Sequence, residues 1–189
     1  MENKKTILIN LIGGPGIGKS TIAAFLYVQM KLHNFNVEQV QEVAKYYVYR
    51  GEFKKLNCQL NISKEQFGLF DAYNGIIDYI VTDGSILHGL YFNRNNPDNI
   101  SDLVEVENYI LEKHNSILSI NILLERPNDA FYEKEGRIQS EDESKYIDKY
   151  LEAELIKHDI KYIKIDADIL NVLGILKYIK NESKKLLRE

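Results

Sequence analysis

The chain has 189 residues, a formal net charge of −4 and an apolar content of 44%, which fit one globular domain able to bury a core without disulfides. The acidic balance argues against broad nucleic-acid binding, although a local basic groove stays open. The apolar runs are shorter than the roughly 20 residues that cross a bilayer, and the single cysteine cannot form an internal disulfide. We therefore expect one cytoplasmic domain, residues 1–189, with no membrane partner.

Apolar runs of strand length recur along the chain, each followed by a stretch of helical character. The predicted strands are 6–12, 37–40, 79–82, 117–124 and 162–165. The predicted helices are 19–33, 43–50, 64–78, 102–114, 141–158 and 169–187. Strands that alternate with helices are typical of right-handed crossovers around a parallel sheet. The sequence therefore predicts an α/β fold with a five-stranded parallel sheet.

Local signals mark two helix starts and one loop. Ser63 followed by Gln66, and Ser140 followed by Glu143, are capping-box patterns, which predict that helices begin there. Residues 93–101 contain four asparagines and one proline. This stretch is the best candidate for a mobile loop, with solvated surface as the commoner meaning of such a composition.

A phosphate-binding loop follows the first predicted strand. Residues 13–20 read G-G-P-G-I-G-K-S, a complete match to the pattern G-x-x-x-x-G-K-[ST] between a strand and a helix. Glycine lets the backbone turn tightly and point N–H groups at an anion, and the helix N-terminus adds its dipole. Lys19 is expected to reach the β- and γ-phosphates, and the Ser20 hydroxyl to bind Mg²⁺. The expected nucleotide-binding residues are Gly13, Gly14, Pro15, Gly16, Ile17, Gly18, Lys19, Ser20 and Thr21.

Acidic residues follow two further strands, at the edge where parallel sheets bind ligands. Asp83 ends the run 79–82 and stands where a second acidic residue holds Mg²⁺, usually through water. In the alternative interpretation Asp83 and Gly84 make a turn and Ser85 caps the next helix, and both interpretations can hold together. Glu42 follows the second strand and can accept the proton of an acceptor hydroxyl or bind its hydroxyl groups. In the alternative interpretation, Glu42 only stands at the start of a helix, where the helix dipole favours a negative charge.

Residues 126–140 form a polar connector that contains two arginines. Arginine is suited to spreading phosphate charge in a transfer transition state, and such a connector is typical of a lid that closes over a nucleotide. We therefore predict a short lid in which Arg137 is the first candidate and Arg126 the second. The alternative is that both arginines are solvated in an exposed loop.

The histidines and three tyrosines after Glu42 could take part in binding, but each also has a purely structural interpretation. The four histidines show none of the usual zinc spacings, so no zinc site is expected. His88 lies near Asp83, but a histidine on a helix surface is the ordinary interpretation. Tyr46, Tyr47 and Tyr49 follow Glu42 and could stack on a planar acceptor, although packing is the safer assignment.

Taken together, these residues resemble the P-loop kinase superfamily, and within it the ribosylnicotinamide-kinase-like domain of the NAD-biosynthesis regulator family with its phage and bacterial relatives. The resemblance covers roughly residues 7–165. It rests on G-G-P-G-I-G-K-S, Glu42-Val-Ala-Lys, Val-Thr-Asp83 and Leu-Leu-Glu-Arg126…Gly-Arg137…Gln139.

The resemblance implies a three-layer P-loop NTPase fold with ATP and Mg²⁺ as cofactors. It also implies phosphoryl transfer to a hydroxyl of a nucleoside- or nucleotide-like small molecule, such as ribosylnicotinamide, a nucleoside or a nucleoside monophosphate. Lys19, Glu42, Asp83, Arg126 and Arg137 would then form the catalytic set, and Ser20 with Asp83 the metal site. This sequence would then be too short to contain, in addition, the nucleotidyltransferase and DNA-binding domains of the regulator proteins.

Two alternatives stay open. One is an ATP-hydrolysing switch or regulatory ATPase that moves a partner. The other is a kinase acting on nucleic-acid ends or modified bases, which the acidic balance disfavours. A GTPase is disfavoured because neither Asn-Lys-x-Asp nor an Asp-x-x-Gly switch element is present, and an AAA-type motor because a helical lid domain is missing. The acceptor, the donor nucleotide and the oligomeric state stay undetermined at this stage.

Overall fold

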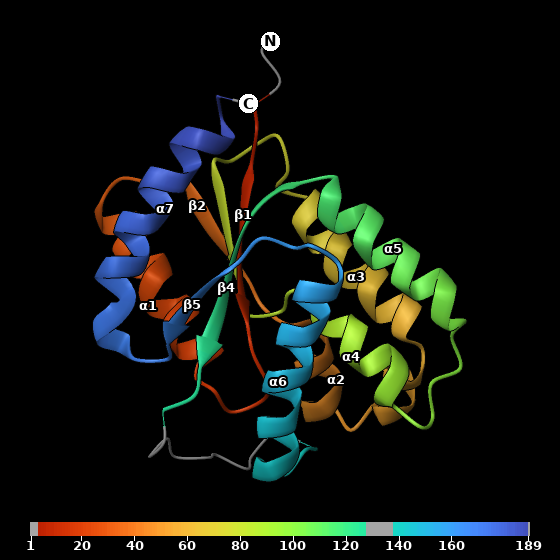
Figure 1. Ribbon diagram of the computed structural model, residues 1–189. Helices are drawn as coiled ribbons and strands as arrows, with labels where there is room; N and C mark the ends of the chain where they lie inside the picture. The colour runs from red at the N-terminus through yellow and green to blue at the C-terminus, as the bar shows by residue number, and fades with distance from the viewer. Residues whose placement is uncertain (1–3, 128–137, 189) are drawn as a thin grey trace.

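The computed structural model describes residues 4–127 and 138–188. Its strands lie parallel in one sheet of five, in the order β2-β3-β1-β4-β5, with helices on both faces (Figure 1). The strands are β1 (Ile7–Ile12), β2 (Val37–Val40), β3 (Tyr79–Thr82), β4 (Leu118–Glu125) and β5 (Ile163–Asp166). This arrangement confirms the predicted three-layer α/β fold with a five-stranded parallel sheet.

Helices α1 and α7 cover one face of the sheet, and α3, α4, α5 and α6 cover the other (Figure 1). The helices are α1 (Lys19–Leu32), α2 (Val43–Tyr49), α3 (Gln59–Asp71), α4 (His88–Asn95), α5 (Leu103–Asn115), α6 (Glu141–Lys157) and α7 (Val172–Leu186). Short 3₁₀ turns η1 (Phe53–Asn57) and η2 (Ile169–Asn171) precede α3 and α7. Five of the predicted helices agree with these bounds to within three residues.

Strand β1 is buried along its whole length because it lies in the middle of the sheet. Its side chains alternate between the faces. Ile7, Ile9 and Leu11 pack with α1 and α7, whereas Leu8 and Ile12 pack with the other four helices. A strand covered on both faces needs an apolar residue at nearly every position, which explains why β1 is apolar except at Asn10. The side-chain amide of Asn10 donates to Asn121 Oδ1 on β4 at 2.9 Å.

The strand order brings four loops together at the carboxyl ends of the strands. Strand β1 lies between β3 and β4, and β2 pairs with β3. The segments that follow β1, β3, β4 and β2 therefore lie side by side. They carry the phosphate-binding loop, Asp83, Arg126 and Glu42.

Helix α3 does not begin at Ser63 as the capping-box pattern predicts. It begins at Gln59, and Ser63 is a buried residue inside it. The first N–H groups of α3 are satisfied by distant side chains, since the amide of Leu60 donates to Ser101 Oγ at 3.1 Å and that of Gln59 to Asn99 Oδ1 at 3.4 Å. A cap supplied by tertiary contact thus replaces the local one. In contrast, both hydrogen bonds of the predicted box at Ser140 are present.

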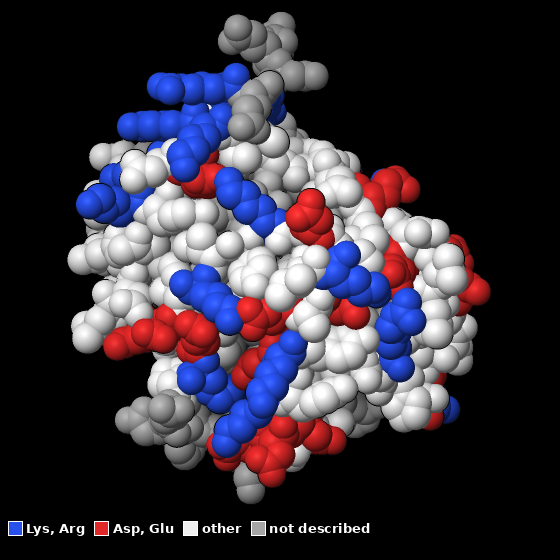
Figure 2. All heavy atoms as spheres, viewed as in Figure 1, with Lys and Arg blue, Asp and Glu red and all other residues white. Residues whose placement is uncertain are grey.

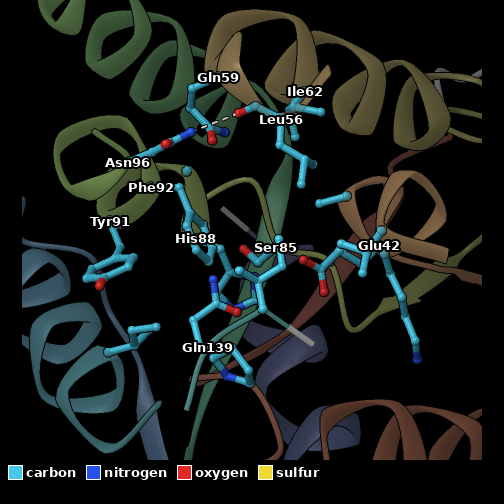
Figure 3. Close-up of a pocket in the computed structure, with 18 of the residues that line it drawn as sticks. Glu42, Leu56, Gln59, Ile62, Ser85, His88, Tyr91, Phe92, Asn96 and Gln139 are labelled. Carbon is cyan, nitrogen blue, oxygen red and sulfur yellow. Dashed lines mark hydrogen bonds between the residues drawn. The ribbon is translucent and has the colours of Figure 1, made fainter. Parts of the chain in front are cut away.

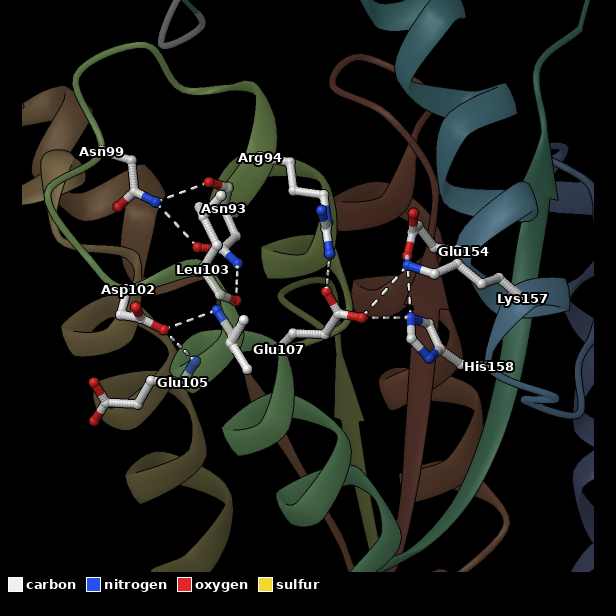
Figure 4. A network of polar contacts seen from close by, with 11 residues as sticks. Asn93, Arg94, Asn99, Asp102, Leu103, Glu105, Glu107, Glu154, Lys157 and His158 are labelled. Atoms are coloured by element: carbon white, nitrogen blue, oxygen red, sulfur yellow. Dashed lines mark hydrogen bonds and ion pairs between the residues drawn. The ribbon is translucent and has the colours of Figure 1, made fainter.

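The expected loop at 93–101 is partly helical, because α4 ends only at Asn95. The rest is held by asparagine side chains (Figure 4). Asn99 Nδ2 donates to the backbone carbonyl of Asn93 at 2.8 Å, and Asn93 Nδ2 donates to the carbonyl of Leu103 at 2.8 Å. The asparagines that suggested a mobile loop therefore tie the end of α4 to the start of α5.

A charged network joins α4, α5 and α6 (Figure 4). Glu107 of α5 pairs with Arg94 of α4, and its Oε1 lies 3.4 Å from the Nζ of Lys157 on α6. His158, just past α6, lies between Glu107 and Glu154. Because these groups share partners, the network holds the three helices in one arrangement on this face of the sheet.

Acidic and basic side chains are interspersed over much of the face shown in Figure 2. One such group is Lys164, which pairs with Glu152 at 2.6 Å and lies 3.8 Å from Glu125. Within residues 4–127 and 138–188, no helix is both long enough and apolar enough to cross a membrane.

His114 of α5 makes the stability of the fold depend on pH. Its side chain is buried, and burial lowers its pKa from 6.5 to about 4. Below pH 6.5 the unfolded chain binds a proton at His114 that the folded chain does not bind. The free energy of unfolding is therefore not reduced by this group above pH 6.5, and it falls as the pH drops toward 4. We expect the free energy of unfolding to fall by about 2 kcal/mol from this group between pH 7.5 and 5.0.

Urea unfolding at the two pH values measures this effect. His114→Leu should lose this part of the pH dependence, whereas His33→Gln, which alters an exposed histidine, should keep it. An unchanged pH dependence in His114→Leu would contradict the prediction.

Candidate active site

The phosphate-binding loop runs from the end of β1 to the start of α1. Gly18 occupies the N-cap position of α1 with φ = 100°, a left-handed conformation that favours glycine and turns the chain into the helix. Lys19 Nζ donates to the backbone carbonyls of Gly13 at 2.7 Å and Gly14 at 2.9 Å. Burial lowers the pKa of Lys19, while Glu42 and Asp83 nearby raise it. The ammonium group thus lies inside the loop, where an anion would meet it.

Ser20 and Asp83 meet at the edge of this loop. Ser20 Oγ donates to Asp83 Oδ2 at 2.5 Å, and Asp83 is only 2% exposed. Its other oxygen, Oδ1, is buried and has no hydrogen-bond partner in the part of the chain that the structure describes. A buried carboxylate oxygen without a partner is costly. A divalent cation beside the two side chains would remove that cost, so these residues fit a Mg²⁺ ion.

The donor set also fits magnesium rather than zinc. Among the described residues, no group of three or more His, Cys, Asp and Glu side chains is placed to hold a metal ion. Magnesium needs few protein ligands, because it keeps several waters and binds phosphate oxygens directly. One hydroxyl and one carboxylate are therefore a sufficient protein contribution.

Glu42 stands at the N-cap position of α2, but its side chain makes no cap hydrogen bond and lines the cavity instead (Figure 3). Gln66 of α3 holds the backbone on either side of it, since Oε1 accepts from the N–H of Val43 at 2.8 Å and Nε2 donates to the carbonyl of Gln41 at 3.2 Å. A Cβ on Gly84 would lie 2.6 Å from the Cα of Glu42. Glycine at that position therefore allows the two loops to approach.

Burial raises the pKa of the Glu42 carboxyl group, an effect that Lys19 opposes and Asp83 reinforces. A carboxylate with a raised pKa is a stronger base than a solvated one. The electrostatics at Glu42 therefore suit proton acceptance.

A cavity of about 680 Å³ connects these groups (Figure 3). At one end it is lined by the phosphate-binding loop, and Glu42 and Ser85 lie along it. Past Glu42 it continues between η1, α3 and α4 into a space that we call the far chamber. The far chamber is lined by Phe53, Leu56, Gln59, Ile62, Phe92 and Asn96. Aromatic rings beside side-chain amides are the surroundings that planar polar ligands prefer.

Arg126 lies against the phosphate-binding loop, with its side chain 10% exposed. Its Nη2 donates to the carbonyl of Pro15 at 3.0 Å, and its Nε pairs with Asp148 Oδ2 at 2.9 Å. The alternative of a solvated arginine is therefore wrong for Arg126. Arg137 and most of the predicted lid lie outside the described residues. Gln139, at the end of that segment, lines the cavity.

Asp148 of α6 is a residue of the site that was not among the predicted ones. Its Oδ1 accepts from the backbone N–H of Gly14 at 2.5 Å, in addition to the ion pair with Arg126. The carboxylate thus links α6, the loop and the residue after β4. No local pattern could have revealed it, because Gly14 and Asp148 are 134 residues apart in the chain.

The ordinary interpretation of His88 as a surface residue is wrong. The side chain is 7% exposed, and its Nε2 accepts from the backbone N–H of Gly13 at 3.3 Å. Ser85 Oγ accepts from the N–H of Leu87 at 3.3 Å, just before α4. This contact lies in the turn before the helix, because Leu87 occupies the N-cap position of α4 and no side chain caps it. The interpretation of Ser85 as a helix cap is therefore wrong, whereas Asp83 contacts Ser20.

Solved structures with a similar fold come from two kinds of protein. The chain is similar to a deoxyadenosine kinase from M. mycoides with the products dCMP and a flexible dCDP bound, at a TM-score of 0.59 and 19% identity over 93% of this chain and 98% of that one. It is also similar to a NadR protein in complex with NAD and AMP-PNP, at a TM-score of 0.64 and 10% identity over 92% of this chain. The chain spans only 49% of that second protein.

At these identities the likeness concerns the fold. In the comparison with curated proteins, none matched this chain. A family model described as an AAA domain matches residues 8–170; that description names a type of domain and states no activity. The matched segment contains the phosphate-binding loop, Glu42, Asp83 and Arg126, so the chain belongs to the AAA domain family and has the fold of the P-loop kinase superfamily.

Proposed function

We propose that this protein is an ATP- and Mg²⁺-dependent kinase that transfers the γ-phosphate to a hydroxyl of a nucleoside- or nucleotide-like small molecule. One observation carries the proposal. A single cavity joins the phosphate-binding loop, the Glu42 carboxylate and the far chamber. A hydrolase needs only water beyond the phosphate, whereas a transferase needs a shaped space for a second substrate in line with it.

The residues along this cavity would have different roles in the reaction. The backbone N–H groups of the loop and Lys19 bind the phosphates, and Glu42 accepts the proton of the attacking hydroxyl. A Mg²⁺ ion held by Ser20 and Asp83 would neutralise phosphate charge. Arg126, fixed against the loop by Asp148, places a further positive charge beside the nucleotide, and Arg137 is proposed to do so from the lid.

The acceptor would bind in the far chamber. Phe53 and Phe92 offer aromatic surfaces, and Gln59 and Asn96 offer amide groups. These groups suit a planar heteroaromatic base, which can stack on a ring and pair its polar edge with an amide. The two similar solved structures, one of a deoxyadenosine kinase and one with bound NAD and AMP-PNP, support an acceptor of this class.

Transfer of label from γ-labelled ATP with Mg²⁺ tests the proposal. The acceptors are ribosylnicotinamide, nucleosides, nucleoside monophosphates and oligonucleotides, each also assayed with Lys19→Ala. A labelled small molecule that the variant fails to produce supports the proposed kinase. Label on an oligonucleotide would identify a nucleic-acid kinase instead, and free phosphate with every acceptor would identify a regulatory ATPase.

Glu42→Gln is expected to lower kcat by about 10²- to 10³-fold, because the amide cannot accept the proton of the hydroxyl. Nucleotide affinity should stay close to that of the wild type, since Gln66 holds the same backbone in both proteins. Steady-state transfer and calorimetric binding of an ATP analogue measure the two effects. Glu38→Gln on β2, where Glu38 pairs with Lys31, is the matched control and should keep full activity. A wild-type kcat in Glu42→Gln would exclude Glu42 as the base.

A further inference from the structure

His88 is the first residue of α4, and its ring lines the cavity between the phosphate-binding loop and the far chamber (Figure 3). With 7% of the residue exposed, it is a buried polar group at the centre of the site. The roles proposed above for Lys19, Glu42 and Asp83 leave this imidazole without a function.

The contact with Gly13 assigns the tautomer of His88. Because Nε2 accepts the hydrogen bond from the backbone N–H of Gly13, the lone pair at Nε2 is in use and the proton of a neutral ring must be on Nδ1. Burial and the nearby Lys19 ammonium group lower the pKa of His88 well below 6.5, which keeps the ring neutral. The site therefore holds an uncharged ring with an N–H donor at Nδ1.

This Nδ1–H group has no hydrogen-bond partner among the residues that the structure describes. The ring borders the cavity, so the donor is available to a ligand there. The ring contacts the first residue of the phosphate-binding loop through Nε2, and the charge of Lys19 acts on it. A donor fixed in place before the substrate arrives costs no reorganisation when charge develops on a nearby oxygen.

We propose that the Nδ1–H group of His88 donates a hydrogen bond to an oxygen of the phosphoryl group held by the loop. This inference rests on the proposed function. It makes His88 a further substrate-binding residue whose neutrality avoids repulsion with Lys19. The competing assignment is structural, in which the ring only supports the loop through Gly13.

Two substitutions separate the two nitrogen atoms. In His88→Gln the side-chain oxygen reaches the position of Nε2 and keeps the contact with Gly13, but the donor at Nδ1 is lost. In His88→Asn the amide group reaches the position of Nδ1 and keeps a donor there, but the contact with Gly13 is lost. The thermal midpoint of each variant shows how much the contact with Gly13 stabilises the protein. The kcat of phosphoryl transfer shows how much the donor at Nδ1 contributes to the reaction.

We expect His88→Gln to lose about 10- to 100-fold in kcat with a nearly unchanged thermal midpoint, by comparison with the loss of other preorganised donors. His88→Asn should keep more of kcat than His88→Gln and show the lower thermal midpoint. A wild-type kcat in His88→Gln, or an equal loss of kcat in both variants, would overturn the proposal.

Nitrogen-15 NMR of the imidazole in the wild-type protein tests the same idea without relying on a variant that folds. We expect the Nδ1–H tautomer in the free protein and a shift of the Nδ1 signal when a non-hydrolysable ATP analogue binds with Mg²⁺. Two results would overturn the proposed contact with the phosphoryl group. One is an Nε2–H tautomer in the free protein, and the other is an Nδ1 signal that shifts when the acceptor is added but not when the ATP analogue is added. A wild-type protein that binds the analogue and shifts Nδ1, but labels no acceptor, contradicts the kinase function and leaves this contact supported.

Discussion

Lys19→Ala is expected to lower phosphoryl transfer by at least about 10³-fold, the range seen when a charge that stabilises a phosphoryl transition state is removed. In the structure the ammonium group of Lys19 lies inside the loop, bound to the carbonyls of Gly13 and Gly14. Lys45 also lines the cavity, but its Nζ lies at Ser20 Oγ, 3.4 Å away, and not at the carbonyls of the loop. Labelled transfer with saturating ATP and Mg²⁺ measures the loss.

The same substitution should leave the fold intact. Burial lowers the pKa of Lys19, so removing the side chain relieves a desolvation cost, which offsets the loss of its hydrogen bonds to the carbonyls of Gly13 and Gly14. We expect a thermal midpoint close to that of the wild type. The control is Lys31→Ala on the same helix, where Lys31 forms an exposed pair with Glu38 at 2.9 Å. Full transfer activity in Lys19→Ala would exclude the kinase proposal.

Asp83→Asn is expected to lower transfer by about 10²- to 10³-fold and to raise the Mg²⁺ concentration needed for half-maximal rate. The amide keeps an oxygen that can accept from Ser20, so the shape of the site is preserved. It removes the negative charge and puts an amide nitrogen in place of the buried Oδ1 that has no hydrogen-bond partner among the described residues. A Mg²⁺ titration of the initial rate measures the change.

Stability gives the second readout for Asp83→Asn. Because burying a charged carboxylate costs more free energy than burying a neutral amide, the metal-free variant should unfold at a higher urea concentration than the metal-free wild type. A purely structural aspartate would give the opposite result. Asp78→Asn is the matched control, since Asp78 directly precedes β3 and forms an exposed pair with Lys4 at 2.9 Å. An unchanged Mg²⁺ requirement in Asp83→Asn would remove Asp83 from the metal site.

Local patterns predicted the elements whose causes are local. Strands β1, β3 and β4 were readable because each is mainly apolar, whereas β2 and β5 mix apolar and polar residues. The start of α6 was readable because Ser140 and Glu143 cap it within four residues. Helix α4 was not predicted. It has eight residues, one of them Gly89, and no side-chain cap, so neither length nor a terminal signal marks it. The helix is instead positioned by its packing against α5 and α6.

The error at α3 has the same cause. Ser63 and Gln66 have the right spacing for a capping box, yet both are buried for other reasons. Gln66 holds the backbone beside Glu42, and the true start of α3 is capped from the connection between α4 and α5. A spacing rule cannot distinguish a local cap from a long-range contact when both use the same residue types.

The sequence by itself determined the phosphate-binding loop and the acidic residues after β2 and β3, because backbone chemistry at a loop and at strand ends depends on neighbours along the chain. Only the tertiary structure decided which groups support that loop. His88 contacts it across 75 residues and Asp148 across 134. Contacts of that length arise from the strand order and from helix packing, and they leave no spacing in the sequence from which they could be predicted.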